Sequence, residues 1–210
     1  MSNEPASDRV RVRRLAERGS YDQQTVHAIL DEALVAHVGI AGDRGPVVLP
    51  MTFGRAADTL YLHGAVGNDL LVQADGADVC VTVTLLDGLV IARSAFHHSM
   101  NYRSVVVRGP ARRVADPDEL ELALRSITDR VGVGRYDDCR RPDPSEIRKT
   151  RVMAVPLTEV SAKVRTGGPV DDEADRDLDH WAGVVPLVTR RGPVEPAADL
   201  PAGIPTPPYL

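Results

Sequence analysis

A histidine and two glycines follow one another where a short apolar run ends, in the order LYLHGAVGND from Leu60 to Asp69. A histidine can donate, accept or transfer a proton near neutral pH. Glycine lets backbone N–H groups approach a ligand closely, and a helix start carries partial positive charge. The turn after His63 therefore suits a phosphate group, and His63 is the candidate catalytic residue, with a purely structural role as the alternative. The surrounding stretch, Val47 to Asp69, is the predicted centre of the functional site.

Four further residues carry side chains that suit a polar or aromatic ligand. Arg103 and Ser104 stand together at a predicted strand start, where a guanidinium fork and a hydroxyl fit a phosphate or a polar ring edge. Lys163, near the end of a long β segment, is a further cation, and solvation at the surface is its alternative role. Trp181 is the single tryptophan, and it fits either stacking on an aromatic ring or plugging a core or interface.

Other kinds of site have no support in the sequence. His97 and His98 are adjacent, so they point in different directions, and no cysteine or acidic residue stands at ligand spacing. We therefore predict no metal site and place these histidines at a pocket or subunit boundary. The chain has no Gly-x-Ser-x-Gly elbow, no Walker motif and no dinucleotide-binding fingerprint.

The elements that must position these residues are mainly short β runs. Their spacing, with helices inserted rather than alternating, predicts an antiparallel barrel of the α+β type with helical additions. The strongest helix start is Asp116-Pro117, an N-cap followed by proline at the first helical position. The predicted strands lie at 34–41, 47–53, 59–63, 78–86, 89–92, 102–114 and 152–164, and the last is interrupted by Pro156. The predicted helices start near 22, 70, 116 and 145, with an irregular or helical crossing at 94–101.

Composition indicates a globular protein of 210 residues, 43% hydrophobic, with a net charge of −5. The charge argues against nucleic acid or an anionic membrane as a partner. Two cysteines give no disulfide framework, and the start of the chain lacks signal-peptide character, so we expect a cytoplasmic protein. We expect a basic arm at 1–20, one domain at 21–190 and a proline-rich tail at 191–210.

Five segments in the same order resemble the pyridoxamine 5′-phosphate oxidase-like flavoproteins, and within them the nitroimidazole-resistance branch. The segments are LPMTF at 49–53, LYLHGA at 60–65, VCVTVT at 79–84, NYRSVVVRG at 101–109 and WAGVVPL at 181–187. The resemblance implies a split β-barrel that binds flavin mononucleotide (FMN) at the interface of a homodimer. It also assigns contacts with the cofactor to the following residues: Pro50, Met51, Thr52, Phe53, His63, Gly64, Ala65, Gly67, Asn68, Arg103, Ser104, Lys163 and Trp181.

The resemblance further implies an FMN-dependent oxidoreductase of a small molecule, with nitroaromatic compounds as one candidate substrate class and His63 beside the flavin. Two alternatives stay open: a non-catalytic flavin- or haem-binding module with His63, His97 or His98 as axial ligand, and a deazaflavin-dependent reductase. One departure from the family pattern is Asp69, which stands where relatives often carry a cation. Phosphate charge must then be met elsewhere, by Arg103, Arg93 or Lys163. No basic cluster for pyridoxamine phosphate is visible near the C-terminus.

Overall fold

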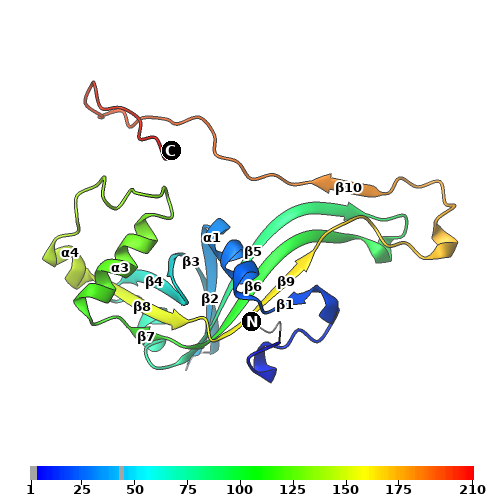
Figure 1. The fold of residues 1–210 in the computed structure, drawn as a ribbon, viewed down its shortest axis with the longest axis horizontal. Helices are drawn as coiled ribbons and strands as arrows, with labels where there is room; N and C mark the ends of the chain where they lie inside the picture. Colours follow the sequence, from blue (N-terminus) through cyan, green and yellow to red (C-terminus); the bar gives the residue numbers. More distant parts are fainter. Residues whose placement is uncertain (1–3, 43–44) are drawn as a thin grey trace.

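The computed structural model describes residues 4–42 and 45–210 and shows a bent, mainly antiparallel sheet with helices at its sides (Figure 1). The strand order is β1-β9-β6-β5-β2-β3-β4-β8-β7, with β10 paired to β5, and the sheet does not close. The predicted class, mainly β with helical additions, is confirmed. The strands are β1 (Gly19–Ser20), β2 (Val35–Gly42), β3 (Gly45–Ala56), β4 (Thr59–Ala65), β5 (Asp78–Ile91), β6 (Ser99–Pro110), β7 (Arg112–Arg113), β8 (Thr150–Pro156), β9 (Glu159–Arg165) and β10 (Gly183–Pro186).

The helices are α1 (Gln23–Glu32), α2 (Asp69–Gln73), α3 (Pro117–Thr128) and α4 (Pro144–Lys149). Asp22 caps α1 by accepting the Thr25 N–H at 2.8 Å, and Asp116 caps α3 by accepting the Glu119 N–H at 2.9 Å. Both starts follow from local sequence, because a short acidic side chain satisfies an amide that has no helical partner. Among the described residues, none of the helices is long and apolar enough to cross a membrane.

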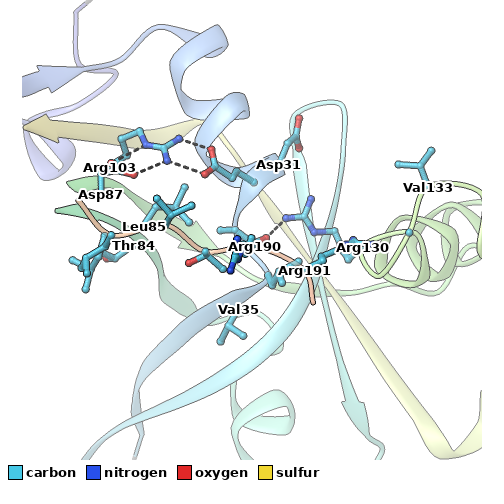
Figure 2. Close-up of a pocket in the computed structure, with 18 of the residues that line it drawn as sticks. Asp31, Val35, Thr84, Leu85, Asp87, Arg103, Arg130, Val133, Arg190 and Arg191 are labelled. Atoms are coloured by element: carbon cyan, nitrogen blue, oxygen red, sulfur yellow. Dashed lines mark hydrogen bonds and ion pairs between the residues drawn. The ribbon is translucent and has the colours of Figure 1, made fainter. Parts of the chain in front are cut away.

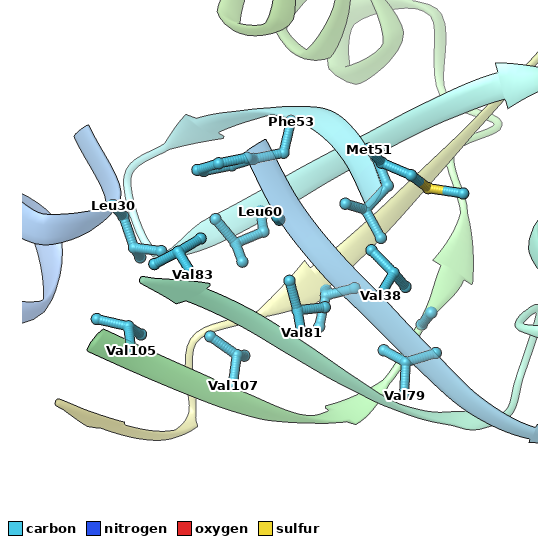
Figure 3. Close-up of a cluster of buried hydrophobic side chains, with 14 of the residues drawn as sticks. Leu30, Val38, Met51, Phe53, Leu60, Val79, Val81, Val83, Val105 and Val107 are labelled. Carbon is cyan, nitrogen blue, oxygen red and sulfur yellow. The ribbon is translucent and has the colours of Figure 1, made fainter. Parts of the chain in front are cut away.

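The core lies inside the bend of the sheet, where alternate residues of the central strands meet (Figure 3). In β5 the inward residues are Val79, Val81 and Val83, each at most 3% exposed, as the alternation of the sequence predicts. Burial of each such side chain contributes about 1.5–3 kcal/mol. A second cluster packs α3 on the opposite face of β4 and β8, through Tyr61 and Ile127 among others.

Strand β3 joins the two halves of the barrel. Its first half pairs with β2 and its end pairs with β4. Helix α3 packs directly on β3 at Gly54, where an added Cβ would lie 2.6 Å from the backbone nitrogen of Ile127. A residue without a side chain is therefore required at this crossing.

Several predicted boundaries were wrong. The runs 78–86 and 89–92 form one strand, β5, with an irregularity between Leu86 and Gly88. The run 152–164 is two strands, and β8 and β9 join opposite ends of the sheet because the chain turns after Pro156. The crossing at 94–101 is a single 3₁₀ turn, Ala95–His97, before β6 begins. The apolar spacing after Asp116 predicts a buried face that includes Leu122 and Val131, but Leu122 on α3 and Val131 in the loop after it are 45% and 55% exposed.

The two ends of the chain behave differently. Residues of the basic arm lie on the barrel: β1 pairs with β9, and Arg9 forms ion pairs with Asp78 and Glu159. The tail after β10 is extended and runs back toward α3 and α4 (Figure 1). The expected turn at 42–45 includes Asp43 and Arg44, which lie outside the described residues. The division into arm, domain and tail stays a prediction.

Candidate functional site

His63 lies on β4, where it pairs with Val152 of β8. Its side chain shares the outer face of the strand with Tyr61, away from the main core formed by Leu60 and Leu62. The ring is half-buried, and its Nδ1 has no hydrogen-bond partner. Burial lowers the pKa of His63, because desolvation disfavours the charged form. The side chain is thus a neutral imidazole with an unused nitrogen.

The predicted flavin strand, Pro50 to Phe53, divides between two faces. Pro50 and Thr52 are exposed on the outer face, where they pair with His37 and Val35 of β2. Met51 and Phe53 point into the core, at 9% and 0% exposure. Only their backbone can therefore face a ligand on the outer side of the sheet.

The segment from Gly64 to Asn68 is held by hydrogen bonds within the turn and to the end of α4. The Val66 N–H donates to the Lys149 carbonyl at 2.7 Å, and the Asn68 N–H donates to the Ala65 carbonyl at 2.8 Å. The Asn68 side chain caps α2 by accepting the Leu71 N–H at 3.2 Å. Two of the amides expected to face a phosphate are thus used internally.

Gly64 and Gly67 differ in the space around the position that a side chain would take. An added Cβ at Gly64 would lie 2.9 Å from Leu71 Cδ1, so close packing against α2 explains this residue. At Gly67 there is nothing within 4 Å of the position that a Cβ would take. The predicted role of both glycines and of Ala65 in holding a phosphate stays a prediction.

Arg103 is already paired with acids from two other elements. Its guanidinium binds Glu32 at the end of α1 and Asp87 on β5, with Nη2 at 2.8 Å from Glu32 Oε1 and 2.7 Å from Asp87 Oδ1. These two ion pairs lower the pKa values of Glu32 and Asp87 and raise the pKa of Arg103. A phosphate at this guanidinium would have to compete with two carboxylates.

The remaining predicted contacts lie apart from His63. The Ser104 hydroxyl donates to the Lys163 carbonyl at 3.3 Å, and Lys163 Nζ donates to the Arg14 carbonyl at 2.8 Å. Trp181 is 67% exposed, and its ring lies over Gly183. The stacking role predicted for Trp181 stays a prediction.

A cavity of about 980 Å³ opens on the same side of the sheet as Val35 and His37 (Figure 2). Its wall combines the end of α1, the outer faces of β2 and β5, the loop after α3 and the C-terminal tail. Of the predicted residues only Arg103 lines it. The sequence reading missed four basic residues of the wall, His37, Arg130, Arg190 and Arg191, because the tail and the loop meet the sheet only in three dimensions.

Arg130 is the most constrained of these side chains. It donates to the carbonyls of Leu30, at 2.6 Å, and of Ala33, which are unpaired groups at the end of α1. Its guanidinium carbon lies 4.8 Å from the centroid of the Phe53 ring. Its Nε is buried without a partner, and burial lowers its pKa.

Three histidines have a polar group within hydrogen-bonding distance of the ring. His27 and His97 lie 3.0 and 3.1 Å from the carboxylates of Asp58 and Asp172, and His98 Nδ1 lies 2.9 Å from the Ser94 carbonyl. His97, Asp172 and Asp175 also bring donor atoms within 4.8 Å of one another.

Two histidines on the outer face, His37 and His63, have no polar partner among the described residues. His180, which is exposed in the acidic segment, likewise has none there. Of these three histidines, only His63 is half-buried.

The outer face with its half-buried histidine can be compared with known proteins. The family model described as pyridoxamine 5′-phosphate oxidase matches residues 22–164. The chain belongs to the pyridoxamine 5′-phosphate oxidase family. No curated protein gives a match.

Several solved structures of the family are similar to this chain. The flavocytochrome Anf3 from Azotobacter vinelandii is 40% identical with a TM-score of 0.92, covering 98% of this chain and 96% of its own. An FAD- and haem-binding protein from Mycobacterium smegmatis is 36% identical with a TM-score of 0.86, covering 91% and 95%. A 5-nitroimidazole antibiotic resistance protein, so described, from Bacteroides thetaiotaomicron is 29% identical with a TM-score of 0.57, covering 70% and 86%. The predicted family and its split-barrel fold are confirmed.

Proposed function

We propose that this protein is a homodimeric redox protein that binds a flavin and a haem and acts as an oxidoreductase toward a small molecule. The observation that carries the proposal is the extent of likeness to flavin- and haem-binding proteins, which covers 98% and 91% of this chain. The likeness to the nitroimidazole-resistance protein covers only 70%. The similarity to the flavin- and haem-binding proteins therefore covers more of the chain than the similarity to the nitroimidazole-resistance protein.

The flavin belongs on the outer face, along Pro50 and Thr52 and beside the cavity at Val35 and His37. Pockets for organic ligands span about 300–1,000 Å³, so the cavity of about 980 Å³ suits a large one. The M. smegmatis relative is described as binding FAD. We therefore propose FAD in place of the FMN expected from the sequence.

His63 is the side chain that best suits the haem iron. An iron ligand must be a neutral imidazole, and burial keeps His63 neutral, whereas His27, His97 and His98 have polar partners. When bound, flavin and haem together supply electron transfer between two-electron and one-electron partners. The chain contributes the binding surface, the orientation of both groups and the imidazole of His63.

The partner in the dimer is a second copy of this chain, placed against the outer face of β2 and β3. Two large apolar side chains on this face are exposed, Val35 at 48% and Val48 at 60%. Exposed apolar side chains gathered on one face mark an interaction surface. Light scattering after gel filtration is expected to give a dimer, and Val48→Lys a monomer. Val72→Lys, at a similarly exposed valine on α2, is the control that keeps the dimer.

Reconstitution tests cofactor binding. Apoprotein is mixed with FAD and with haem, and the absorption spectrum is recorded after unbound cofactor is removed. We expect retained flavin bands and a Soret band. His63→Ala is expected to shift or abolish the Soret band, and His180→Ala to leave it unchanged. A protein that retains neither group after gel filtration contradicts the proposal.

A further inference from the structure

We propose that the phosphate groups of the flavin nucleotide bind in the cavity of Figure 2, at Arg130, Arg190 and Arg191, rather than at the turn after His63. This inference rests on the proposed flavin binding and names the part of the surface that recognises the anionic half of the cofactor. Arg130 comes from the loop after α3, and Arg190 and Arg191 come from the C-terminal tail.

The acids of the cavity wall are already committed to other groups. Asp31 forms an ion pair with Arg55, and Glu32 and Asp87 share Arg103. Asp129, the fourth acid, accepts the Tyr136 N–H at 2.8 Å. All four negative charges thus have a cation or an amide from outside the group of Arg130, Arg190 and Arg191 as partner.

Within residues 4–42 and 45–210, no carboxylate forms an ion pair with Arg130, Arg190 or Arg191. Arg130 donates two hydrogen bonds to backbone carbonyls, and its buried Nε has no partner. A buried donor without a partner destabilises the protein unless a ligand or a water molecule accepts its hydrogen bond. Arg190 is exposed with no polar partner among the described residues, and Arg191 donates to the Tyr209 carbonyl at 3.3 Å. Guanidinium groups bind phosphate by paired hydrogen bonds, so this cluster suits a phosphate or diphosphate.

The tail is fastened in a position that presents its two arginines to the cavity. The Tyr209 hydroxyl donates to Asp138 Oδ2 at 2.6 Å, and Arg135 donates to the same hydroxyl at 3.3 Å. The Tyr209 ring packs against Gly132, where an added Cβ would meet it at 2.5 Å. The start of the tail, residues 187–191, and Tyr209 near its end therefore both belong to the cavity wall.

The turn after His63 is the weaker alternative. Its Val66 and Asn68 amides donate internally, and Asp69 places a negative charge beside it. Its α2 helix has only five residues. A small cavity of about 350 Å³ next to Asn68 and Asp69 has no cationic side chain in its wall.

The test compares three ligands: riboflavin has no phosphate, FMN differs from it by one phosphate alone, and FAD has two phosphates together with an adenosine. Dissociation constants are measured by flavin fluorescence on apoprotein of the full chain. We expect Arg190→Ala/Arg191→Ala to bind FMN or FAD about ten- to a hundred-fold more weakly, the loss typical of hydrogen bonds to a charged group. Its affinity for riboflavin is expected to be unchanged. Arg148→Ala, an exposed arginine on α4, is the control and is expected to leave all three constants unchanged.

Gly67→Ala separates the two sites, because the added methyl meets nothing in the protein. If this variant selectively weakens FMN while the double arginine variant does not, the phosphate lies at the turn and the inference is overturned. Equal losses for riboflavin and FMN in the arginine variant also overturn it, since phosphate recognition is then not involved. If the unaltered protein binds riboflavin but gains nothing from phosphate, only the inference fails. If it binds no flavin at all, the proposed function fails as well.

Discussion

Gly54→Ala is expected to destabilise the protein by loosening α3 from β3. The new Cβ would lie 2.6 Å from both the Ile127 nitrogen and the Ser126 carbonyl carbon, which are backbone atoms that cannot rotate away. Helix and strand must separate by about 0.8 Å to reach the 3.4 Å at which ordinary contact begins. Overpacking of this kind costs about 1–3 kcal/mol. The lower entropy of the unfolded alanine chain offsets about 0.4–1 kcal/mol of it. The expected net loss is about 1–2 kcal/mol.

Urea unfolding followed by circular dichroism measures this loss as a lower midpoint with an unchanged slope. Gly67→Ala is the matched control, since it meets no neighbouring atom and its φ is not positive, and it is expected to unfold at or slightly above the wild-type midpoint. Because Arg130 follows α3 directly, Gly54→Ala is also expected to weaken flavin binding. A Gly54→Ala protein as stable as the wild type would refute the packing argument.

Three other changes test separate contacts. The pKa of His63 is lowered from its ordinary value of 6.5, so below about pH 6.5 the unfolded chain takes up a proton that the folded protein does not. The protein should therefore lose stability relative to His63→Gln as the pH falls below about 6.5. Urea midpoints at several pH values would show this loss, and parallel curves for the two proteins would contradict it. Arg103→Gln should cost about 1 kcal/mol at low salt and less at high salt, because the ion pairs are partly exposed. The wild-type advantage over this variant should disappear as pH falls through the lowered pKa values of Glu32 and Asp87; an advantage that persists in acid would contradict the pairing. Tyr209→Ala should release the tail and speed its limited proteolysis, whereas equal cleavage rates would show that the contacts with Asp138 do not hold it.

Alternation along a strand and helix capping depend on neighbouring residues, and the elements that they determine were predicted correctly. The alternation of Val79, Val81 and Val83 defines the buried face of β5, and the Asp116-Pro117 pair starts α3 where expected. The order of five short segments predicted the family and its fold, which the relatives confirm. Boundaries failed at residues such as Gly88 and Pro156, where pairing with distant strands decides whether a strand continues.

The candidate site was less predictable because its contacts join distant residues. Arg103 looked free in the sequence, yet Glu32, 71 positions away, binds it together with Asp87. The cavity wall needs the tail beside the loop after α3, so nothing near Arg190 in the sequence indicates the role proposed for it. The half-buried state of His63 likewise depends on the strands that flank β4.

The central claim, that one polypeptide carries both a flavin and a haem, is tested most directly by extracting and quantifying both groups from the purified protein. We expect FAD and haem in comparable amounts, each close to one per chain when the protein is saturated, with haem lost from His63→Ala and flavin retained. A saturated protein that holds flavin but no haem, or haem but no flavin, would contradict it.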